Sequence, residues 1–283
     1  PDATRVFVVA NQKGGVGKTT TTVNVAAALA QLGQRVLVID LDPQGNASTA
    51  LNVDHHRGVP STYDALVDGA PLTDVISPCP EVDNLWVVPA TIDLAGAEIE
   101  LVSMVARESR LAQALNDETL ARLDVDYVLI DCPAGIEQGF KNATAAAQEA
   151  IIVTTPEVSA IRDADRVIGL LESSGLHRPK LIINRIDPDM VRRGDMMDQK
   201  DVESLLAVEI IGLVPADEHT IVAANRGIPV IHNPKSSAGG AFLRIAARVD
   251  GEEIPLMDLE PKTGLFSRFK GMVGMSGRAY SHA

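Results

Sequence analysis

A short glycine-rich segment contains the residue types that bind phosphate. It reads Lys13-Gly14-Gly15-Val16-Gly17-Lys18-Thr19, and it lies between the apolar run Arg5–Ala10 and a helical pattern over Gly17–Leu32. Glycines allow backbone amides to curve around phosphate oxygens without Cβ clashes, and the N-terminal end of the following helix adds positive potential. An ordinary turn between strand and helix would not need two lysines. The segment from Gln12 to Thr20 is therefore predicted to bind the phosphates of a nucleotide.

Side chains in and near this segment have the chemistry of triphosphate and magnesium binding. Lys18 is expected to reach the β and γ phosphates, and the hydroxyl of Thr19 is expected to hold Mg²⁺. Asp131 ends a second apolar run, Tyr127–Asp131. A carboxylate at the end of a strand beside the loop suits Mg²⁺ bound through a water molecule. The next residue, Cys132, is interpreted as a small buried side chain.

Buried strands must position these side chains, and the composition is typical of them. Apolar residues make up 46% of the 283 residues and aromatic residues only 3%, as in parallel sheets filled by Val, Ile, Leu and Ala. Short apolar runs alternate with helical patterns. We therefore predict an α/β fold with a single doubly wound, mostly parallel sheet of about eight strands flanked by helices.

The predicted elements can be stated by residue range. The apolar runs are Arg5–Ala10, Arg35–Asp40, Leu85–Pro89, Tyr127–Asp131, Ala150–Thr154, Lys180–Asn184 and Glu209–Val214. The helical patterns are Gly17–Leu32, Leu94–Leu115, Gln138–Ala147, Ala160–Ser173, Asp198–Ala207, Glu218–Asn225 and Ala238–Val249. We predict one domain over residues 1–251 and a tail over residues 252–283.

The charge and the cysteines limit the surroundings of the chain. There are 25 Lys and Arg against 38 Asp and Glu, a formal charge of −13, so contact with nucleic acid or anionic lipid would need a local basic patch. The two cysteines have neither a disulfide framework nor a zinc spacing, which fits a reducing cytoplasm. No apolar run reaches the roughly 18 residues of a spanning helix, and we expect no signal segment.

The loop departs from the standard P-loop at its start. The first glycine of G-x-x-x-x-G-K-T would fall at Gln12, and a lysine, Lys13, follows it. This loop resembles the deviant Walker A motif of the ParA/MinD family of ATPases, and the resemblance covers nearly the whole chain. It implies ATP and Mg²⁺ as ligands, a homodimer that forms on ATP binding, and slow hydrolysis by in-line attack of water on the γ-phosphate.

The resemblance also implies roles for particular residues. Lys13 would cross the dimer interface to the partner's nucleotide, like an arginine finger, and would neutralise charge together with Lys18. The alternative for Lys13 is a solvated surface lysine. Asp42 would orient the attacking water, and Asp40 would support the Mg²⁺ shell. Residues that would enclose adenine, unless they only form turns, are Asn184, Arg185, Pro215 and Asp217.

Two branches of the family contribute to the resemblance. Residues 5–115 resemble chromosomal ParA proteins, in the segments Val8–Gln12, Asp40–Asn46 and Pro89–Glu98. Residues 120–283 resemble MinD, in the segments Asp131–Glu137, Pro156–Ser159, Arg162–Arg166 and Arg193–Met196. The sequence leaves open whether this junction, near residues 116–126, is natural or designed. Both branches share one fold and one nucleotide chemistry, so the prediction of an ATPase holds for either.

The tail contains a short amphipathic pattern over residues 264–273. Its apolar residues fall on one face of a helix, and Arg268 and Lys270 add positive charge beside them. This composition suits a helix that lies in a lipid interface, and it resembles the membrane-targeting tail of MinD. The alternative is a terminal helix docked on its own domain. The apolar residues are Leu265, Phe266, Phe269, Met272 and Val273.

Two functions follow from the two branches. A MinD-like ATPase would bind the anionic inner face of the cell membrane, regulate division-site placement and respond to a MinE-like activator. A ParA-like ATPase would bind DNA without sequence preference, partition a chromosome or plasmid and respond to a ParB-like activator. The acidic charge and the tail favour the MinD-like function. A metabolic or cluster-assembly ATPase is a third class, but iron–sulfur carriers would need a paired C-x-x-C, which this sequence lacks.

Overall fold

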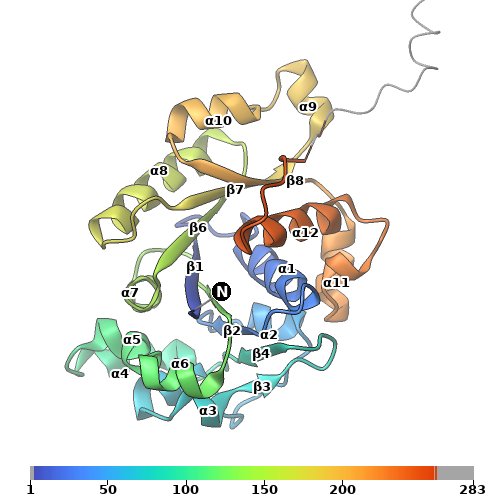
Figure 1. The fold of residues 1–283 in the computed structure, drawn as a ribbon. Coiled ribbons are helices and arrows are strands. Elements are labelled where there is room, and N and C mark those ends of the chain that lie inside the picture. Colours follow the sequence, from blue (N-terminus) through green and yellow to red (C-terminus); the bar gives the residue numbers. More distant parts are fainter. Residues whose placement is uncertain (1–2, 258, 260–283) are drawn as a thin grey trace, which may run out of the picture.

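The computed structural model describes residues 3–257 and 259, and its centre is one eight-stranded sheet (Figure 1). The strand order is β3-β4-β2-β5-β1-β6-β7-β8, and only the pairing of β3 with β4 is antiparallel. The predicted fold class is therefore confirmed. The strands are β1 Arg5–Ala10, β2 Val36–Asp40, β3 Ser77–Pro78, β4 Leu85–Val88, β5 Tyr127–Asp131, β6 Glu149–Thr154, β7 Lys180–Ile186 and β8 Glu209–Pro215.

Helices cover both faces of this sheet (Figure 1). The helices are α1 Lys18–Gln31, α2 Asn46–Ala50, α3 Leu72–Val75, α4 Leu94–Val102, α5 Arg110–Ala114, α6 Asp117–Leu123, α7 Gln138–Ala146, α8 Val158–Ser173, α9 Pro188–Arg193, α10 Gln199–Leu206, α11 His219–Arg226 and α12 Ser237–Val249. Side chains of α4, α5, α7, α8 and α10 belong to one buried cluster, and those of α1 and α12 belong to another.

Successive strand residues point into these two clusters in turn. Val8 of β1 packs into the first cluster, whereas its neighbours Phe7 and Val9 pack into the second. Burial on both faces means that every residue of such a strand can be apolar. This explains why the strands appear in the sequence as nearly continuous apolar runs and could be located there.

Short elements and one break were not found from the sequence. The helical pattern predicted over Leu94–Leu115 is wrong as one helix, because Ala106 has a left-handed backbone (φ 56°) between α4 and a 3-10 turn at Arg107–Ser109. Helices α2, α3, α6 and α9 have only four to seven residues, too few for a clear periodicity. Strand β3 has only two residues, and it is the eighth strand, at one edge of the sheet.

The sheet order brings the predicted chemical residues to one edge. Strands β2, β5 and β1 are neighbours and parallel, so their carboxyl ends lie side by side. Asp40 of β2 is in register with Asp131 of β5, and Asp131 is in register with Val9, one residue before the end of β1. Strands β2, β4 and β5 lie on one side of β1, and β6, β7 and β8 lie on the other, so the strand order reverses at β1. Open α/β sheets place ligands at such a point.

The predicted amphipathic segment over residues 264–273 lies outside the described residues. Among the helices that the structure describes, none combines the length and the apolar composition needed to cross a membrane.

Candidate functional site

The glycine-rich loop between β1 and α1 lines a cavity of about 420 Å³. Gly15 (φ 74°) and Gly17 (φ 102°) have left-handed backbone conformations, which residues with a Cβ rarely adopt. A Cβ on Gly17 would also lie 2.1 Å from the amide nitrogen of Asn184. Both the backbone and the neighbouring side chain therefore require glycine at this position. Loop and helix residues that line the cavity are Gly14, Gly15, Gly17, Lys18, Thr19 and Thr20.

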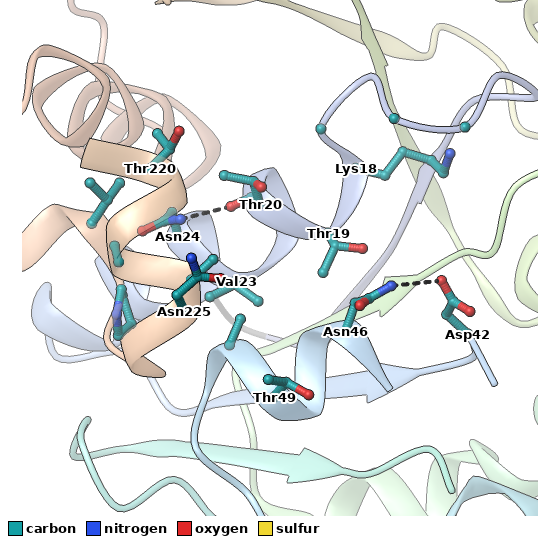
Figure 2. A pocket seen from close by; sticks show the side chains of 18 of the residues that line it. Lys18, Thr19, Thr20, Val23, Asn24, Asp42, Asn46, Thr49, Thr220 and Asn225 are labelled. Atoms are coloured by element: carbon teal, nitrogen blue, oxygen red, sulfur yellow. Dashed lines mark hydrogen bonds between the residues drawn. The ribbon is translucent and has the colours of Figure 1, made fainter. Parts of the chain in front are cut away.

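Lys18 is held against the loop itself. Its side chain is almost buried, and its Nζ donates a hydrogen bond of 2.9 Å to the carbonyl oxygen of Lys13. Burial lowers the pKa of Lys18, although the negative charges of Asp131 and Asp42 oppose this effect. Figure 2 shows the Lys18 ammonium group beside the loop.

Asp131 connects the end of β5 to the first turns of α1. Its Oδ2 accepts a hydrogen bond of 2.8 Å from Thr19 Oγ1, and its Oδ1 accepts one of 3.1 Å from Thr22 Oγ1. Complete burial is the main cause, and the negative charge of Asp40 the second cause, that raise the pKa of Asp131 to about 8. Thr22 was not predicted from the sequence, although its position one helical turn after Thr19 was a usable signal.

The donor set at Thr19 and Asp131 fits Mg²⁺. A hydroxyl and a carboxylate are the hard oxygen ligands that Mg²⁺ prefers, and a dication would offset the negative charge of two adjacent buried carboxylates. Within the described part of the chain, no group of three or more His, Cys, Asp or Glu side chains is arranged as a metal site. The Mg²⁺ ion of a P-loop ATPase does not need three such side chains. One hydroxyl and the nucleotide phosphates hold it directly, and one carboxylate holds it through a water molecule.

Asp40 has contacts that differ from the predicted support of the metal shell. Its Oδ1 accepts a hydrogen bond from the backbone N–H of Asp42, and its Oδ2 accepts two from Ser48. Burial, despite these donors, raises the pKa of Asp40 to about 6. Both carboxylate oxygens are thus engaged within the chain, so this geometry favours a role for Asp40 in holding the loop rather than in direct metal ligation.

Asp42 lies on the wall of the cavity. Its Oδ1 accepts a hydrogen bond of 3.0 Å from the backbone N–H of Gln44, and its Oδ2 lies 3.5 Å from Asn46 Nδ2. Figure 2 shows Asp42 and Asn46 close to Lys18 and Thr19, and all four residues line the cavity. A carboxylate in this place can accept a proton or a hydrogen bond from a water molecule near a bound phosphate.

Lys13 and Gln12 are turned toward α8 and do not line the cavity of their own chain. Lys13 Nζ lies 3.3 Å from Glu157 Oε2 and 2.9 Å from Ser159 Oγ, and Arg166 donates to Gln12 Oε1. The Lys13 side chain is one-third exposed. It is therefore placed at the surface, where a second chain could meet it.

The residues predicted to enclose adenine are not all brought together. Arg185 lines the cavity, and Asn184 donates from Nδ2 to the carbonyl oxygen of Val16 (2.9 Å), which supports the loop from behind. Pro215 and Asp217 are not among the lining residues. The geometry thus gives no support for a base contact by these two residues.

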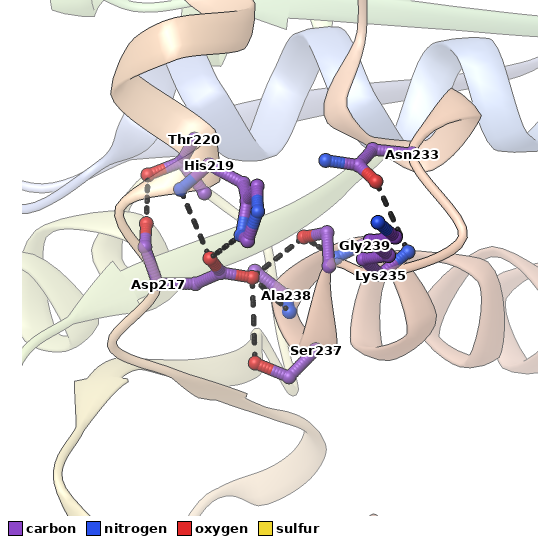
Figure 3. Close-up of polar contacts among 9 residues, drawn as sticks. Asp217, His219, Thr220, Asn233, Lys235, Ser237, Ala238 and Gly239 are labelled. Carbon is purple, nitrogen blue, oxygen red and sulfur yellow. Dashed lines mark hydrogen bonds and ion pairs between the residues drawn. The ribbon is translucent and has the colours of Figure 1, made fainter.

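Asp217 instead fastens the loop after β8 to the start of α12 (Figure 3). Its Oδ2 accepts hydrogen bonds from Ser236 Oγ (2.6 Å) and from the backbone N–H of Ala238 (3.1 Å), and its Oδ1 accepts one from the backbone N–H of His219 (2.9 Å). Burial opposes the charge, but these donors together hold the pKa of Asp217 far below its usual range. The carboxylate is thus fully used within the protein.

A second wall of the cavity comes from α11 with the segment after it, from α2 and from two residues of α1, and the sequence did not indicate this wall. The wall is mostly small or apolar, with a few amide and hydroxyl groups (Figure 2). No motif marks these residues, because they meet only when α11 and α1 both pack against α2. They are Val23, Asn24, Thr49, Ala50, Thr220, Ala223, Ala224, Asn225, Ile228, Pro229 and Val230.

Comparisons with known proteins agree with this geometry. The AAA domain family matches residues 4–177. The septum site-determining protein MinD of Synechocystis sp. is 44% identical over 256 residues, which cover 90% of this chain and 92% of that protein. This alignment extends over both sides of the predicted junction near residues 116–126.

Two solved structures share the fold over most of the chain. The MinC:MinD cell division protein complex of Aquifex aeolicus contains a chain 38% identical to this one, with a TM-score of 0.79 and coverage of 90% of this chain and 98% of that chain. The MinD of Pyrococcus horikoshii OT3, solved with Mg-ADP, is 30% identical, with a TM-score of 0.76 and coverage of 88% and 96%.

Proposed function

Because this chain belongs to the ParA/MinD family of P-loop ATPases, we propose that it is a MinD-like ATPase that binds Mg-ATP, hydrolyses it and takes part in division-site placement. The observation that carries the proposal is the contact of Thr19 with Asp131 at the base of the glycine loop. This contact joins the phosphate site to the metal site in a chain whose MinD relatives match over about nine-tenths of its length.

The loop, Lys18, Thr19, Asp131 and Asp42 each have a role in this reaction. The loop amides and Lys18 bind the phosphates, and Thr19 with Asp131 would hold Mg²⁺, which neutralises charge on the β and γ phosphates when bound. Asp42 orients a water molecule for in-line attack on the γ-phosphate. The second wall, formed by α11 and α2, excludes water from one side of the nucleotide.

Dimerisation is part of the proposal. Lys13 is partly exposed at the surface beside Glu157, and a second copy that docks there would receive this ammonium group near its own nucleotide. Such a cation supplied in trans contributes roughly 10³–10⁵ in rate in related enzymes. Hydrolysis is therefore slow in the single chain and faster in the ATP-bound dimer.

Membrane attachment is proposed for the tail, at the inner face of the cell membrane. A helix of about ten residues is marginal in water and gains stability when its apolar face enters lipid. One copy binds weakly, but two copies on one dimer raise the avidity by roughly 10²-fold or more. ATP thus controls attachment through dimerisation.

Protein partners follow from the same family membership. An Aquifex relative was solved in complex with MinC, and we extend binding of a division-related partner to this chain. A MinE-like activator would then stimulate hydrolysis and release the dimer from the membrane.

One sedimentation experiment tests the proposal. The full chain is pelleted with anionic liposomes, and separately with duplex DNA, in ATP and in ADP. We expect binding to liposomes in ATP only, and loss of that binding after truncation at Pro261. Binding to DNA instead of liposomes, or liposome binding that needs neither ATP nor the tail, would contradict it. A protein that hydrolyses no ATP would contradict the enzymatic part.

A further inference from the structure

The loop that carries Asp42 is closed by a single carboxylate. Asp40, at the end of β2, accepts the backbone N–H of Asp42 (3.0 Å) on one oxygen and the backbone N–H of Ser48 (3.0 Å) on the other. These two contacts join both ends of the loop between β2 and α2 to the same side chain. The position of Asp42 therefore depends on how the Asp40 carboxylate is oriented.

Ser48 is the side chain that sets this orientation. Its Oγ donates a hydrogen bond of 2.8 Å to Asp40 Oδ2 and accepts one of 3.2 Å from the backbone N–H of Ala90, just after β4. Because the Ala90 N–H occupies an acceptor site of the hydroxyl, the hydroxyl hydrogen is directed at Asp40. Asp40, Ser48 and Ala90 are all 0% exposed, so water cannot replace either bond.

Ser48 does not touch the nucleotide site itself. Its neighbours Thr49 and Ala50 line the cavity, but Ser48 does not. The hydrogen bonds connect Ser48 through the Asp40 carboxylate to the backbone of Asp42. Removal of a buried donor also leaves a carboxylate with one fewer partner, and the loop can move to compensate.

We propose that Ser48 is a positioning residue, which holds the Asp42 loop in the geometry that hydrolysis needs. This inference rests on the proposed function, since Asp42 can only act on water if the chain hydrolyses ATP. Misplacement of a reacting group by about 1 Å can cost roughly 100-fold in rate. Binding of ATP depends on the glycine loop and Lys18, which Ser48 does not contact.

The test compares Ser48→Ala with the unaltered full-length protein in steady-state ATP hydrolysis. We expect kcat to fall about 10- to 100-fold while the KM for ATP changes less than about threefold. Ser48→Thr keeps the hydroxyl and is expected to stay within about threefold of the unaltered kcat. A kcat of Ser48→Ala within about twofold of the unaltered value would overturn the inference.

Ser61→Ala is a matched control for the loss of a buried hydroxyl. Ser61 is also buried, and its Oγ donates to Asp64 Oδ2 at 2.9 Å and not to Asp40. The neighbouring Thr62 hydroxyl donates to the backbone carbonyl oxygen of Asp40, so the Asp40 carboxylate keeps its partners in this variant. We expect a similar loss of thermal stability but an unchanged kcat. An equal fall in kcat for Ser61→Ala would show that Ser48 acts only through general stability, and would also overturn the inference.

The experiment distinguishes failure of this inference from failure of the proposed function. If Ser48→Ala does not fold, Ser48→Cys has nearly the same size and a weaker donor, and the same loss of kcat is expected from it. If the unaltered protein hydrolyses ATP and both variants match it, this inference fails while the proposed function stands. If the unaltered protein has no ATPase activity, the proposed function fails first.

Discussion

Asp40, Asp131 and Asp217 are carboxylates with largely buried side chains, but their neighbours give them different chemistry. Burial raises the pKa of Asp131 to about 8 and that of Asp40 to about 6, and the two lie side by side in register. Asp217 is surrounded by hydroxyl and N–H donors, which hold its pKa far below the usual range against the effect of burial. Asp131 is suited to a nearby cation, whereas Asp40 and Asp217 use their carboxylate oxygens to hold loops of their own chain.

Substitution of Asp217 is expected to affect stability and not ATP affinity. Because the folded-state pKa of Asp217 is depressed, its contribution is fully present above the ordinary carboxyl pKa of about 4 and is lost as the pH falls below it. Asp217→Asn should lower the free energy of unfolding at pH 7 by about 1.5–3 kcal/mol, and the difference from the unaltered protein should shrink at pH 3. Urea unfolding at both pH values measures this.

The exposed neighbour Glu218 provides the control for this measurement. Glu218→Gln should leave the free energy of unfolding nearly unchanged at pH 7 and pH 3. If Asp217→Asn were as stable as the unaltered protein but bound ATP much more weakly, the contact with adenine expected from the sequence would be correct after all.

Helices α2 and α11 meet beside the cavity, at the glycine that ends α11. Gly227 has a left-handed backbone (φ 65°), and a Cβ there would lie 3.0 Å from Asn52 Cβ and 3.2 Å from the carbonyl oxygen of Thr49. The close approach of the two helices thus needs glycine for two reasons. Because both helices line the cavity, their separation sets its width.

Gly227→Ala is expected to weaken ATP binding, because α11 must move away from α2. Gly175→Ala is the matched control, since Gly175 also has a left-handed backbone (φ 89°) but a Cβ there meets nothing within 4 Å. Both variants should lose about 1–2 kcal/mol of stability from the backbone alone. Only Gly227→Ala should lower ATP affinity, by about threefold or more in a nucleotide titration. Equal affinities for the two variants would contradict this coupling.

At the scale of the whole molecule, one edge of the sheet combines the cavity with a partly exposed lysine, Lys13. Lys13 is paired with Glu157 and Ser159 of its own chain. Such exposed ion pairs contribute only about 0–1 kcal/mol, so a second chain can displace this contact easily. In the proposed dimer, Lys13 of each copy must leave Glu157 and Ser159 of its own chain and contact the other copy.

Lys13→Ala tests the contribution of the second copy. The variant should still bind ATP, because Lys13 does not line the cavity of its own chain. It should remain monomeric in ATP and lose most of its turnover, measured by analytical ultracentrifugation and ATP hydrolysis. Lys235→Ala, which removes another exposed lysine, should change neither. Normal dimerisation and hydrolysis by Lys13→Ala would exclude a role in trans.

The sequence by itself determined the parts of this protein that depend on neighbouring residues. The phosphate loop lies within eight consecutive residues from Gln12 to Thr19, and strands such as Tyr127–Asp131 are continuous apolar runs. Backbone preferences and burial on two faces act locally, so these features and the family could be recognised without a structure.

Only the tertiary structure decided which distant residues share a contact. The carboxylate of Asp217 meets Ser236, 19 residues away, and Ser48 meets the Ala90 N–H, 42 residues away. No local pattern records such pairs, because they form when the sheet order and the helix packing bring separate segments together. The same reason explains why the wall formed by α11, the support of Asp131 by Thr22 and the role of Asp40 in its loop became visible only in the folded chain.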